Sequence, residues 1–140
     1  MANDFNTNVI NEFRANGGMV SGMFADRTML LLTTTGAKSG ESRTVPLVTI
    51  PQDDRYLLVA SKGGAPTNPD WYWNLRANPT ATIELGGQTF DATLDELTGP
   101  ERQTAFDHVA ATIPGFGDYQ ANTTRVIPVF AFTAPAPATA

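Results

Sequence analysis

Two short loops carry the residues of this chain that are best suited to bind an anion. The first, "TTTGAKSGESR" (33–43), combines glycines and hydroxyls with Lys38 and Arg43. The second, "SKGG" (61–64), holds Lys62, the other of the two lysines of the chain. Glycines let backbone N–H groups approach a ligand closely, and hydroxyl and cationic side chains add donors. Each loop therefore suits a phosphate or carboxylate, although a solvated hairpin loop without a ligand explains the first one equally well.

Aromatic residues follow the second loop. Trp71, Tyr72 and Trp73 include both tryptophans of the chain. Residues two apart on a helix do not share a face, so we expect one tryptophan to pack in the core and the other to be free for a pocket. Aromatic side chains beside a basic, glycine-rich loop suit a ligand with a flat ring system and an acidic tail.

The residue types give little support to other chemistries. The chain has no cysteine and one histidine, which excludes disulfides and argues against a metal site. His108 and Asp107 are neighbours on an expected helix and cannot face each other as a catalytic pair. No phosphate-binding sequence of the GxxxxGK[ST] or GxGxxG type occurs. The net charge of −5 opposes nucleic acid and anionic membranes as partners.

The 140 residues suffice for a single domain with a core, which we place at residues 1–133. Six runs rich in β-forming residues predict strands, most of them joined by short turns. These runs are 28–35, 44–50, 55–61, 80–85, 88–94 and 126–132. A mainly antiparallel sheet of about six strands in a small domain tends to close, so we expect an α+β protein built on a β-barrel with two or three flanking helices.

Two of the expected helices begin at recognisable caps. Asn68 and Pro69 suit the N-cap and first position of one helix, and Thr98 with Glu101 matches a capping box at the start of another. The segment 113–125 reads as a loop.

A third helix is expected within residues 1–20. Its apolar side chains fall on one side and favour packing on the core over a membrane-surface or lid role; they are Phe5, Val9, Ile10 and Phe13. The Pro/Ala-rich end, 134–140, predicts a disordered tail.

Three stretches together resemble the deazaflavin-dependent nitroreductase family. They are "LLTTTGAKSGESRTVPL", "ASKGGAPTNPDWYWNLRANP" and "GDYQANTTRVIPV", in this order and spacing. The resemblance covers roughly Glu12 to Phe130. It implies a small split β-barrel that uses coenzyme F420, an 8-hydroxy-5-deazaflavin with a phosphate and a polyglutamate tail. A polyanionic tail needs a local cluster of cations even on an acidic protein. Attraction between charges in contact outweighs the repulsion by the net charge of the protein, which acts only over longer distances.

The resemblance also implies which residues contact the cofactor. Lys38 and Arg43, with Ser39 beside them, bind the phosphate and acidic tail. The strand after this loop runs along the ring, with Thr44, Val45, Pro46, Leu47 and Val48. The end of the third strand lies at the other edge of the ring, with Val59, Ala60, Ser61 and Lys62. The helix after the second loop covers the cofactor, with Asp70, Trp71 and Asn74.

The chain departs from the family pattern at two places. Ala37 stands where many relatives have a further arginine, which predicts weaker or less selective tail binding. The late loop has Ile113, Phe116 and Tyr119 where nitro-reducing relatives often show several tyrosines, which favours a more apolar acceptor than a nitro compound. Phe116 remains able to wall the ring. Ser61 and Tyr119 are the candidate catalytic donors to the acceptor oxygen, and Tyr119 or water supplies the proton.

The reaction implied is hydride transfer from C5 of the reduced deazaflavin to a small electron-poor acceptor, such as a quinone or an α,β-unsaturated carbonyl. Two alternatives stay open: a split barrel that binds FMN, and a carrier of F420 without turnover. A monomer or homodimer is expected, and the absence of cysteine suits a cytoplasmic protein.

Overall fold

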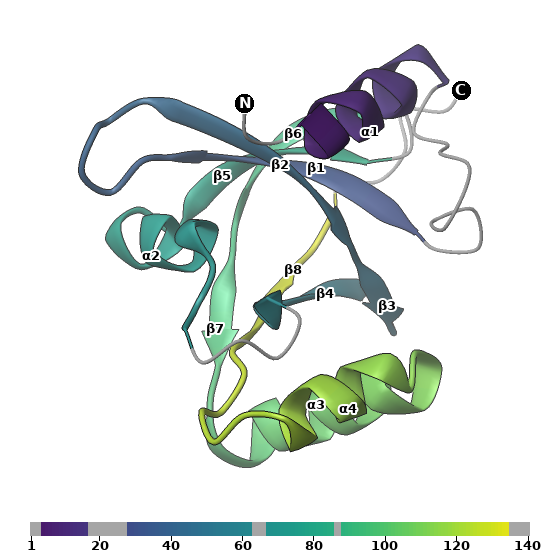
Figure 1. The fold of residues 1–140 in the computed structure, drawn as a ribbon. Helices are drawn as coiled ribbons and strands as arrows, with labels where there is room; N and C mark the ends of the chain where they lie inside the picture. Colours follow the sequence, from purple (N-terminus) through teal and green to yellow (C-terminus); the bar gives the residue numbers. More distant parts are fainter. Residues whose placement is uncertain (1–3, 17–27, 63–66, 86–87, 135–140) are drawn as a thin grey trace.

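The computed structural model describes residues 4–16, 28–62, 67–85 and 88–134, with the side chains of residues 4–6 left out. Its strands form two four-stranded antiparallel sheets (Figure 1). The strand order is β2-β1-β5-β6 in the first sheet and β3-β4-β8-β7 in the second. The strands are Met29–Thr35 (β1), Ser42–Val48 (β2), Ile50–Gln52 (β3), Arg55–Val59 (β4), Thr80–Leu85 (β5), Gln88–Thr93 (β6), Asp95–Leu97 (β7) and Val129–Phe132 (β8).

Two corners join the sheets into a split β-barrel, which confirms the predicted fold. β2 continues into β3 and β6 into β7, so the same two stretches form edges of both sheets. Buried Thr49 lies at the first corner: its N–H donates to the Thr28 carbonyl and its hydroxyl to the Leu57 carbonyl (both 2.9 Å). At the second corner, the N–H of buried Leu94 donates to the Pro79 carbonyl at 2.9 Å. The six predicted strands thus become eight because two of the chain stretches bend.

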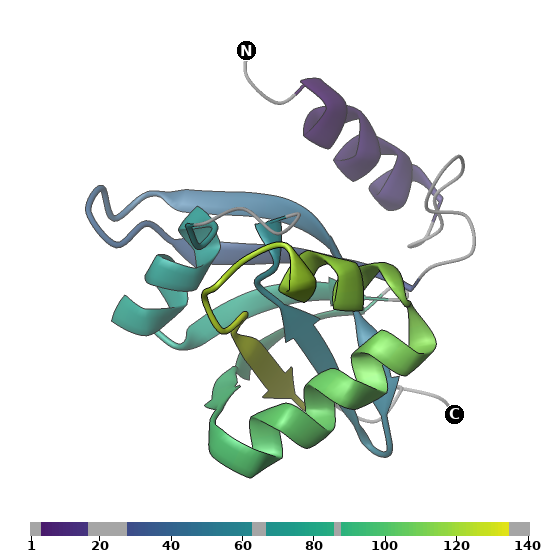
Figure 2. The same ribbon diagram turned by 60° about the horizontal axis from the view of Figure 1, so that its bottom comes forward.

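The described residues form four helices, one more than the sequence predicts at most. α1 lies on the outer face of the first sheet, α2 lies below the β1–β2 hairpin, and α3 and α4 cover the second sheet (Figures 1 and 2). The helices are Asp4–Ala15 (α1), Asp70–Ala77 (α2), Gly99–Thr112 (α3) and Gly115–Ala121 (α4).

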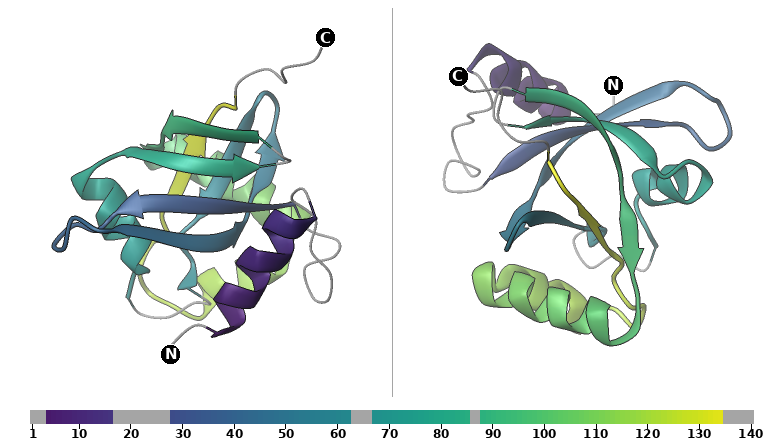
Figure 3. Two further views of the ribbon diagram at one scale, coloured as in Figure 1. Left: turned by 90° about the horizontal axis from the view of Figure 1, so that it is seen from above. Right: turned by 180° about the vertical axis from the view of Figure 1, so that it is seen from behind.

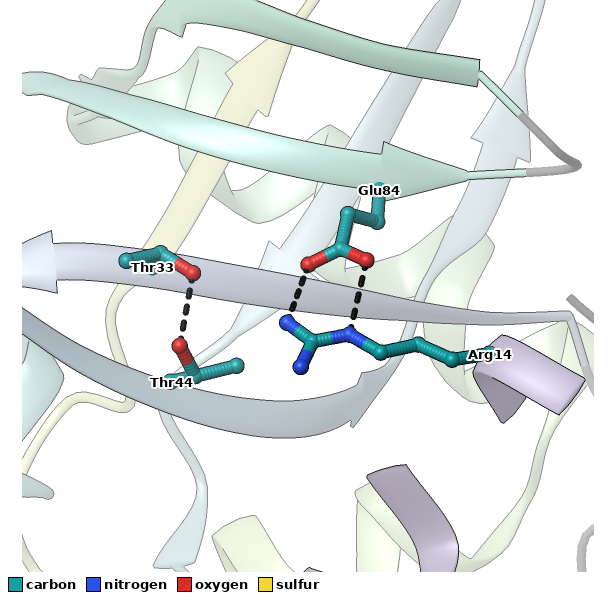
Figure 4. A network of polar contacts seen from close by, with 4 residues as sticks. All are labelled: Arg14, Thr33, Thr44 and Glu84. Atoms are coloured by element: carbon teal, nitrogen blue, oxygen red, sulfur yellow. Dashed lines mark hydrogen bonds and ion pairs between the residues drawn. The ribbon is translucent and has the colours of Figure 1, made fainter. Parts of the chain in front are cut away.

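α1 packs on the barrel as predicted. Val9 and Phe13 are buried against Met29 and Leu31 of β1. Arg14 donates from Nε and Nη2 to the carboxylate of Glu84 on β5, at 3.0 and 2.7 Å (Figure 4), and this hydrogen bonding is the main cause of the raised pKa of Arg14. Figure 3 shows the helix from above, across the outer face of the sheet. The side chain of Phe5, like residues 17–20 and 135–140, lies outside the described part.

Three local predictions are wrong. α2 begins at Asp70 with Pro69 as N-cap, because the Asn68 side chain instead accepts a hydrogen bond from Arg125 Nη1 at 2.7 Å. Thr98 is the N-cap of α3 but makes no side-chain cap bond, so the capping box does not form. The predicted loop 113–125 contains α4, because Phe116 packs on the core under α3 and the Gln120 side chain bonds buried groups.

The core has two main parts. One fills the space between the sheets and includes Leu32, Ile83 and Phe130, together with Trp71 and Leu75 of α2. The other lies between the second sheet and α3. Its most buried members are Ile50, Leu57, Ala105, Val109, Ile127 and Val129. Because α2 belongs to the first cluster, its position relative to the barrel is fixed by apolar packing.

Candidate functional site

A groove of about 1250 Å³ lies between the β1–β2 hairpin and α2. The hairpin and the helix that form its walls are neighbours in Figure 1. Eight of the sequence-predicted site residues line it: Lys38, Ser39, Arg43, Thr44, Val45, Asp70, Trp71 and Asn74. The remaining lining residues are Thr34, Gly36, Ala37, Ser42, Trp73, Arg76 and Ala77.

The loop between β1 and β2 is held by its own hydrogen bonds. The N–H of Gly36 donates to the Glu41 carbonyl at 2.8 Å, and the N–H of Gly40 donates to the Gly36 carbonyl at 3.0 Å. A side chain at Gly36 would bring a Cβ within 2.5 Å of Ser39 Oγ, and Gly40 has a φ of +74°. The two glycines therefore shape the loop; their own N–H groups are used inside it and are not offered to a ligand.

Buried Asn74 fixes the hairpin to α2. Its Oδ1 accepts the N–H of Ala37 at 2.8 Å, and its Nδ2 donates to Thr34 Oγ1 at 3.0 Å. These two bonds cross from the helix to the end of β1 and the start of the loop. Asn74 thus sets the separation of the two groove walls, a role that the sequence did not indicate.

Three cations line the groove. In the part of the chain that the structure describes, Lys38 has no hydrogen bond or ion pair, and Arg43 is paired only with Glu41, at 3.7 Å. The third is Arg76, which our sequence reasoning missed, although its place two turns into the same helix as Asp70 was a usable signal. Arg76 Nη1 donates to the Tyr72 hydroxyl at 2.6 Å, and this bond is the main cause of its raised pKa.

The two tryptophans divide as expected. Trp71 is 7% exposed and packs on Phe130, with ring centroids 5.8 Å apart. Trp73 is 52% exposed and lies edge-on to Tyr72, at 4.8 Å between centroids. Both line the groove, so it combines cationic and hydroxyl donors with aromatic surface. That donor set fits a planar ligand with an anionic tail.

The other predicted site residues do not line this groove. Pro46, Leu47 and Val48 belong to β2, on the part of the strand that leads away from the loop. Val59, Ala60 and Ser61, at the end of β4, are buried, and Lys62 after them is exposed. Phe116 and Tyr119 belong to α4.

Phe116 and Tyr119 form an aromatic pair on α4. Their ring centroids are 5.7 Å apart and the rings are nearly perpendicular. Phe116 is half-buried against the cluster under α3, whereas Tyr119 is 37% exposed. The structure thus brings the two α4 residues together, with the phenol on the solvent side of the pair.

Buried Arg102 of α3 anchors α4 and the segment that follows it. Its guanidinium donates twice to the Ile127 carbonyl, at 3.1 and 2.7 Å, and once to Gln120 Oε1 at 2.8 Å. It also lies 4.5 Å from the centre of the Phe106 ring. Burial lowers the pKa of Arg102, and the contacts with oxygens and the ring offset the cost of burying its charge.

Two other kinds of site find no support in the described residues. They contain no cluster of three or more His, Cys, Asp or Glu side chains that could hold a metal ion. None of their helices has both the length and the apolar composition needed to cross a bilayer.

Comparisons with known proteins agree with the fold. A family model described as F420H(2)-dependent quinone reductase matches residues 6–134. An F420H(2)-dependent quinone reductase of Mycobacterium tuberculosis is 40% identical over 107 residues, which cover 74% of this chain and 72% of that protein.

Two solved structures are similar in both sequence and fold. One is an F420-H2 dependent reductase (FDR-A), 44% identical with a TM-score of 0.68, covering 76% of this chain and 94% of that one. The other is described as a domain-swapped dimer and is 41% identical with a TM-score of 0.70, covering 90% and 92% of the two chains.

The split barrel and its sequence thus define an oxidoreductase of the F420-dependent class. The chain belongs to the F420H(2)-dependent quinone reductase family, and its cofactor is coenzyme F420. The predicted family resemblance, enzyme class and cofactor are confirmed.

Proposed function

We propose that the protein binds F420 in the groove between the β1–β2 hairpin and α2 and reduces a quinone with it. The observation that carries this proposal is the meeting of three cations and two tryptophans in a groove of about 1250 Å³. When bound, the reduced deazaflavin supplies a hydride from C5; the protein orients it and excludes water.

The residues of the hairpin loop hold the anionic part of the cofactor. Lys38 and Arg43 bind its phosphate and acidic tail, and Ser39 lies between them in the sequence. Both cations are exposed, and Glu41, at 3.7 Å from Arg43, is a weak competitor for that guanidinium. Asn74 holds the loop at its distance from α2, and Trp71 supplies an aromatic wall.

The ring of the cofactor extends from this groove along β2 and the end of β4. Strand β2 offers backbone and small apolar side chains to the ring, and the turn after β4 lies at the opposite edge. The contacts proposed are those of Thr44, Val45, Pro46, Leu47 and Val48 on one side and of Val59, Ala60, Ser61 and Lys62 on the other.

The acceptor binds near Ser61 and the Phe116–Tyr119 pair. Negative charge develops on the acceptor oxygen during reduction, so a donor aimed at it accelerates the reaction. Tyr119 suits this role because it is partly exposed beside an apolar ring. A proton follows from the Tyr119 hydroxyl or from water.

Tyr119→Phe tests this assignment. We expect a loss of turnover with a quinone, smaller than the factor of about 10²–10³ typical of donors in well-organised sites, because Tyr119 is 37% exposed. The affinity for F420 should stay nearly unchanged. Normal turnover of the variant would leave proton delivery to Ser61 or water.

The acceptor class is a quinone or an α,β-unsaturated carbonyl, with nitro compounds second. The single hydroxyl among Ile113, Phe116 and Tyr119 gives this side of the site an apolar character. Oxidation of reduced F420, followed by its absorbance with one acceptor of each kind, ranks the three classes.

The same assay separates the proposal from its alternatives. Steady-state turnover with a quinone excludes a carrier that only holds F420. An FMN enzyme would copurify with a chromophore that absorbs at longer wavelength than a deazaflavin. The related domain-swapped dimer makes a homodimer as reasonable as a monomer for this chain, and sedimentation velocity distinguishes them.

A further inference from the structure

Arg125 joins the chain after α4 to the end of β4. Its Nη1 donates to the Ala60 carbonyl at 3.2 Å and to Asn68 Oδ1 at 2.7 Å, and its Nη2 donates to the Ser61 carbonyl at 2.7 Å. One guanidinium thus holds two successive carbonyls and the segment that leads into α2. A planar, five-donor group is suited to this task, and an ammonium is not, because it cannot reach diverging acceptors in fixed directions.

The turn that Arg125 holds is strained. Lys62 follows directly and has a φ of +47°, a region that costs a non-glycine residue free energy and persists only where neighbours impose it. Its ammonium donates to Thr67 Oγ1 at 3.2 Å. The carbonyl bonds to Ala60 and Ser61 fix the two peptide units that lead into Lys62.

Arg125 is itself held by a hydrogen bond from α4. Its carbonyl accepts a hydrogen bond from Gln120 Nε2 at 2.7 Å, and Gln120 Oε1 accepts from buried Arg102 at 2.8 Å. Burial also lowers the pKa of Arg125. The contacts therefore run without a break from α3 through α4 to the turn after β4.

We propose that Arg125 is a positioning residue for the cofactor, which acts by holding Lys62 in its strained conformation at the edge of the site where the proposed function places the deazaflavin ring. The inference rests on the proposed role of Lys62 in F420 binding. It assigns a positioning function to the segment after α4, which also contacts the β4 turn through the hydrogen bond from the Ala60 N–H to the Pro128 carbonyl.

The first test needs no ligand. Hydrogen exchange of the amides at 61–62 is compared in the native protein and in Arg125→Lys, with Arg55→Lys as control because Arg55 bonds Gln52 and Glu101 at the opposite end of β4. We expect faster exchange at 61–62 in Arg125→Lys alone. Unchanged exchange would overturn the proposal.

The second test is a double-mutant cycle on F420 affinity, measured by fluorescence quenching. Lys62→Met should weaken binding by about tenfold, Arg125→Lys by a similar factor, and the double variant no more than Lys62→Met. If the double variant loses affinity by the product of the two single losses, or if Arg125→Lys keeps the native affinity for F420, Arg125 does not act through Lys62. A native protein that binds no F420 refutes the proposed function, while the exchange result still decides how Arg125 acts on the turn.

Discussion

The proposed cofactor groove and the proposed acceptor side are built in opposite ways. Each wall of the groove is one continuous stretch, 34–45 or 70–77, and a single side chain, Asn74, joins the two walls. The proposed acceptor side draws on α4, on the turn after β4, on buried Arg102 and on partly buried Gln120, which lie far apart in the sequence. The cations of the first region are exposed, whereas the second depends on the buried polar contacts of Arg102. Substitutions of the groove cations should therefore affect ligand binding, substitution of Arg102 should affect stability, and substitution of buried Asn74 should affect both.

Arg102→Met should produce the largest loss of stability. It removes both donors of the Ile127 carbonyl, while Gln120 Oε1 keeps the Ile127 N–H. The unsatisfied carbonyl and the lost charge-assisted bond to Gln120 each cost about 1–3 kcal/mol, so we expect the free energy of unfolding to fall by about 3 kcal/mol. Urea denaturation measures this. Arg55→Met, which removes a partly exposed ion pair with Glu101, serves as control and should cost about 1 kcal/mol or less. Equal losses in both variants would mean that burial of Arg102 does not matter.

Asn74→Leu should lower both the stability of the protein and its affinity for F420. The substitution preserves volume but removes both bonds between α2 and the hairpin, so the loop loses its fixed distance from the helix. We expect F420 affinity to fall about tenfold or more and the free energy of unfolding by about 1–3 kcal/mol. Asn78→Ala, at the end of the same helix, is the control. A lower melting temperature with native F420 affinity would show that the hairpin position is unimportant for binding.

Arg43→Ala should affect binding alone. Its side chain is 62% exposed and paired only loosely with Glu41, so the melting temperature should hardly change. Loss of a charge-assisted bond to the cofactor should weaken F420 binding by about tenfold. Glu41→Gln is the matched control on the same loop, expected to leave affinity unchanged or slightly raised. Early melting with unchanged binding would make Arg43 structural.

Phe116→Tyr should produce the smallest change. It restores a hydroxyl on α4 beside Tyr119, where nitro-reducing relatives often carry tyrosines. We expect a severalfold gain in turnover of nitro compounds relative to quinones, with F420 affinity unchanged. Steady-state kinetics with both acceptors check this. No gain would mean that this position does not set the acceptor class.

The difference between the regions explains what the sequence could predict. The cations of the hairpin loop, Lys38 and Arg43, were predicted because a loop pattern is local, and the split of the two tryptophans followed from helical spacing. Other groove residues, such as Thr44, Val45, Asp70 and Asn74, were implied only by the family resemblance. The strands were predicted for the same reason, through their composition. The corners at Thr49 and Leu94 were not foreseen, because they depend on hydrogen bonds to Thr28, Leu57 and Pro79, which are distant in the sequence.

The errors share one physical cause, which is competition from distant residues. Asn68 is a good N-cap by type, but Arg125 takes its side-chain oxygen. Glu101 suits a capping box but lies 3.5 Å from Arg55 instead. α4 contains two glycines and looks like a loop, yet Gln120 and Phe116 hold it as a helix through contacts with α3 and the segment before β8. No local pattern reports such contacts.

The most direct test of the account is a parallel titration with F420 and FMN by fluorescence quenching. The protein and its Lys38→Ala/Arg43→Ala variant are compared at the same ionic strength. We expect the native protein to bind F420 much more tightly than FMN, and the double variant to lose most of this preference while keeping its melting temperature. Comparable native affinities for both ligands, or an F420 affinity that survives the loss of both cations, would contradict binding in the groove between the hairpin and α2.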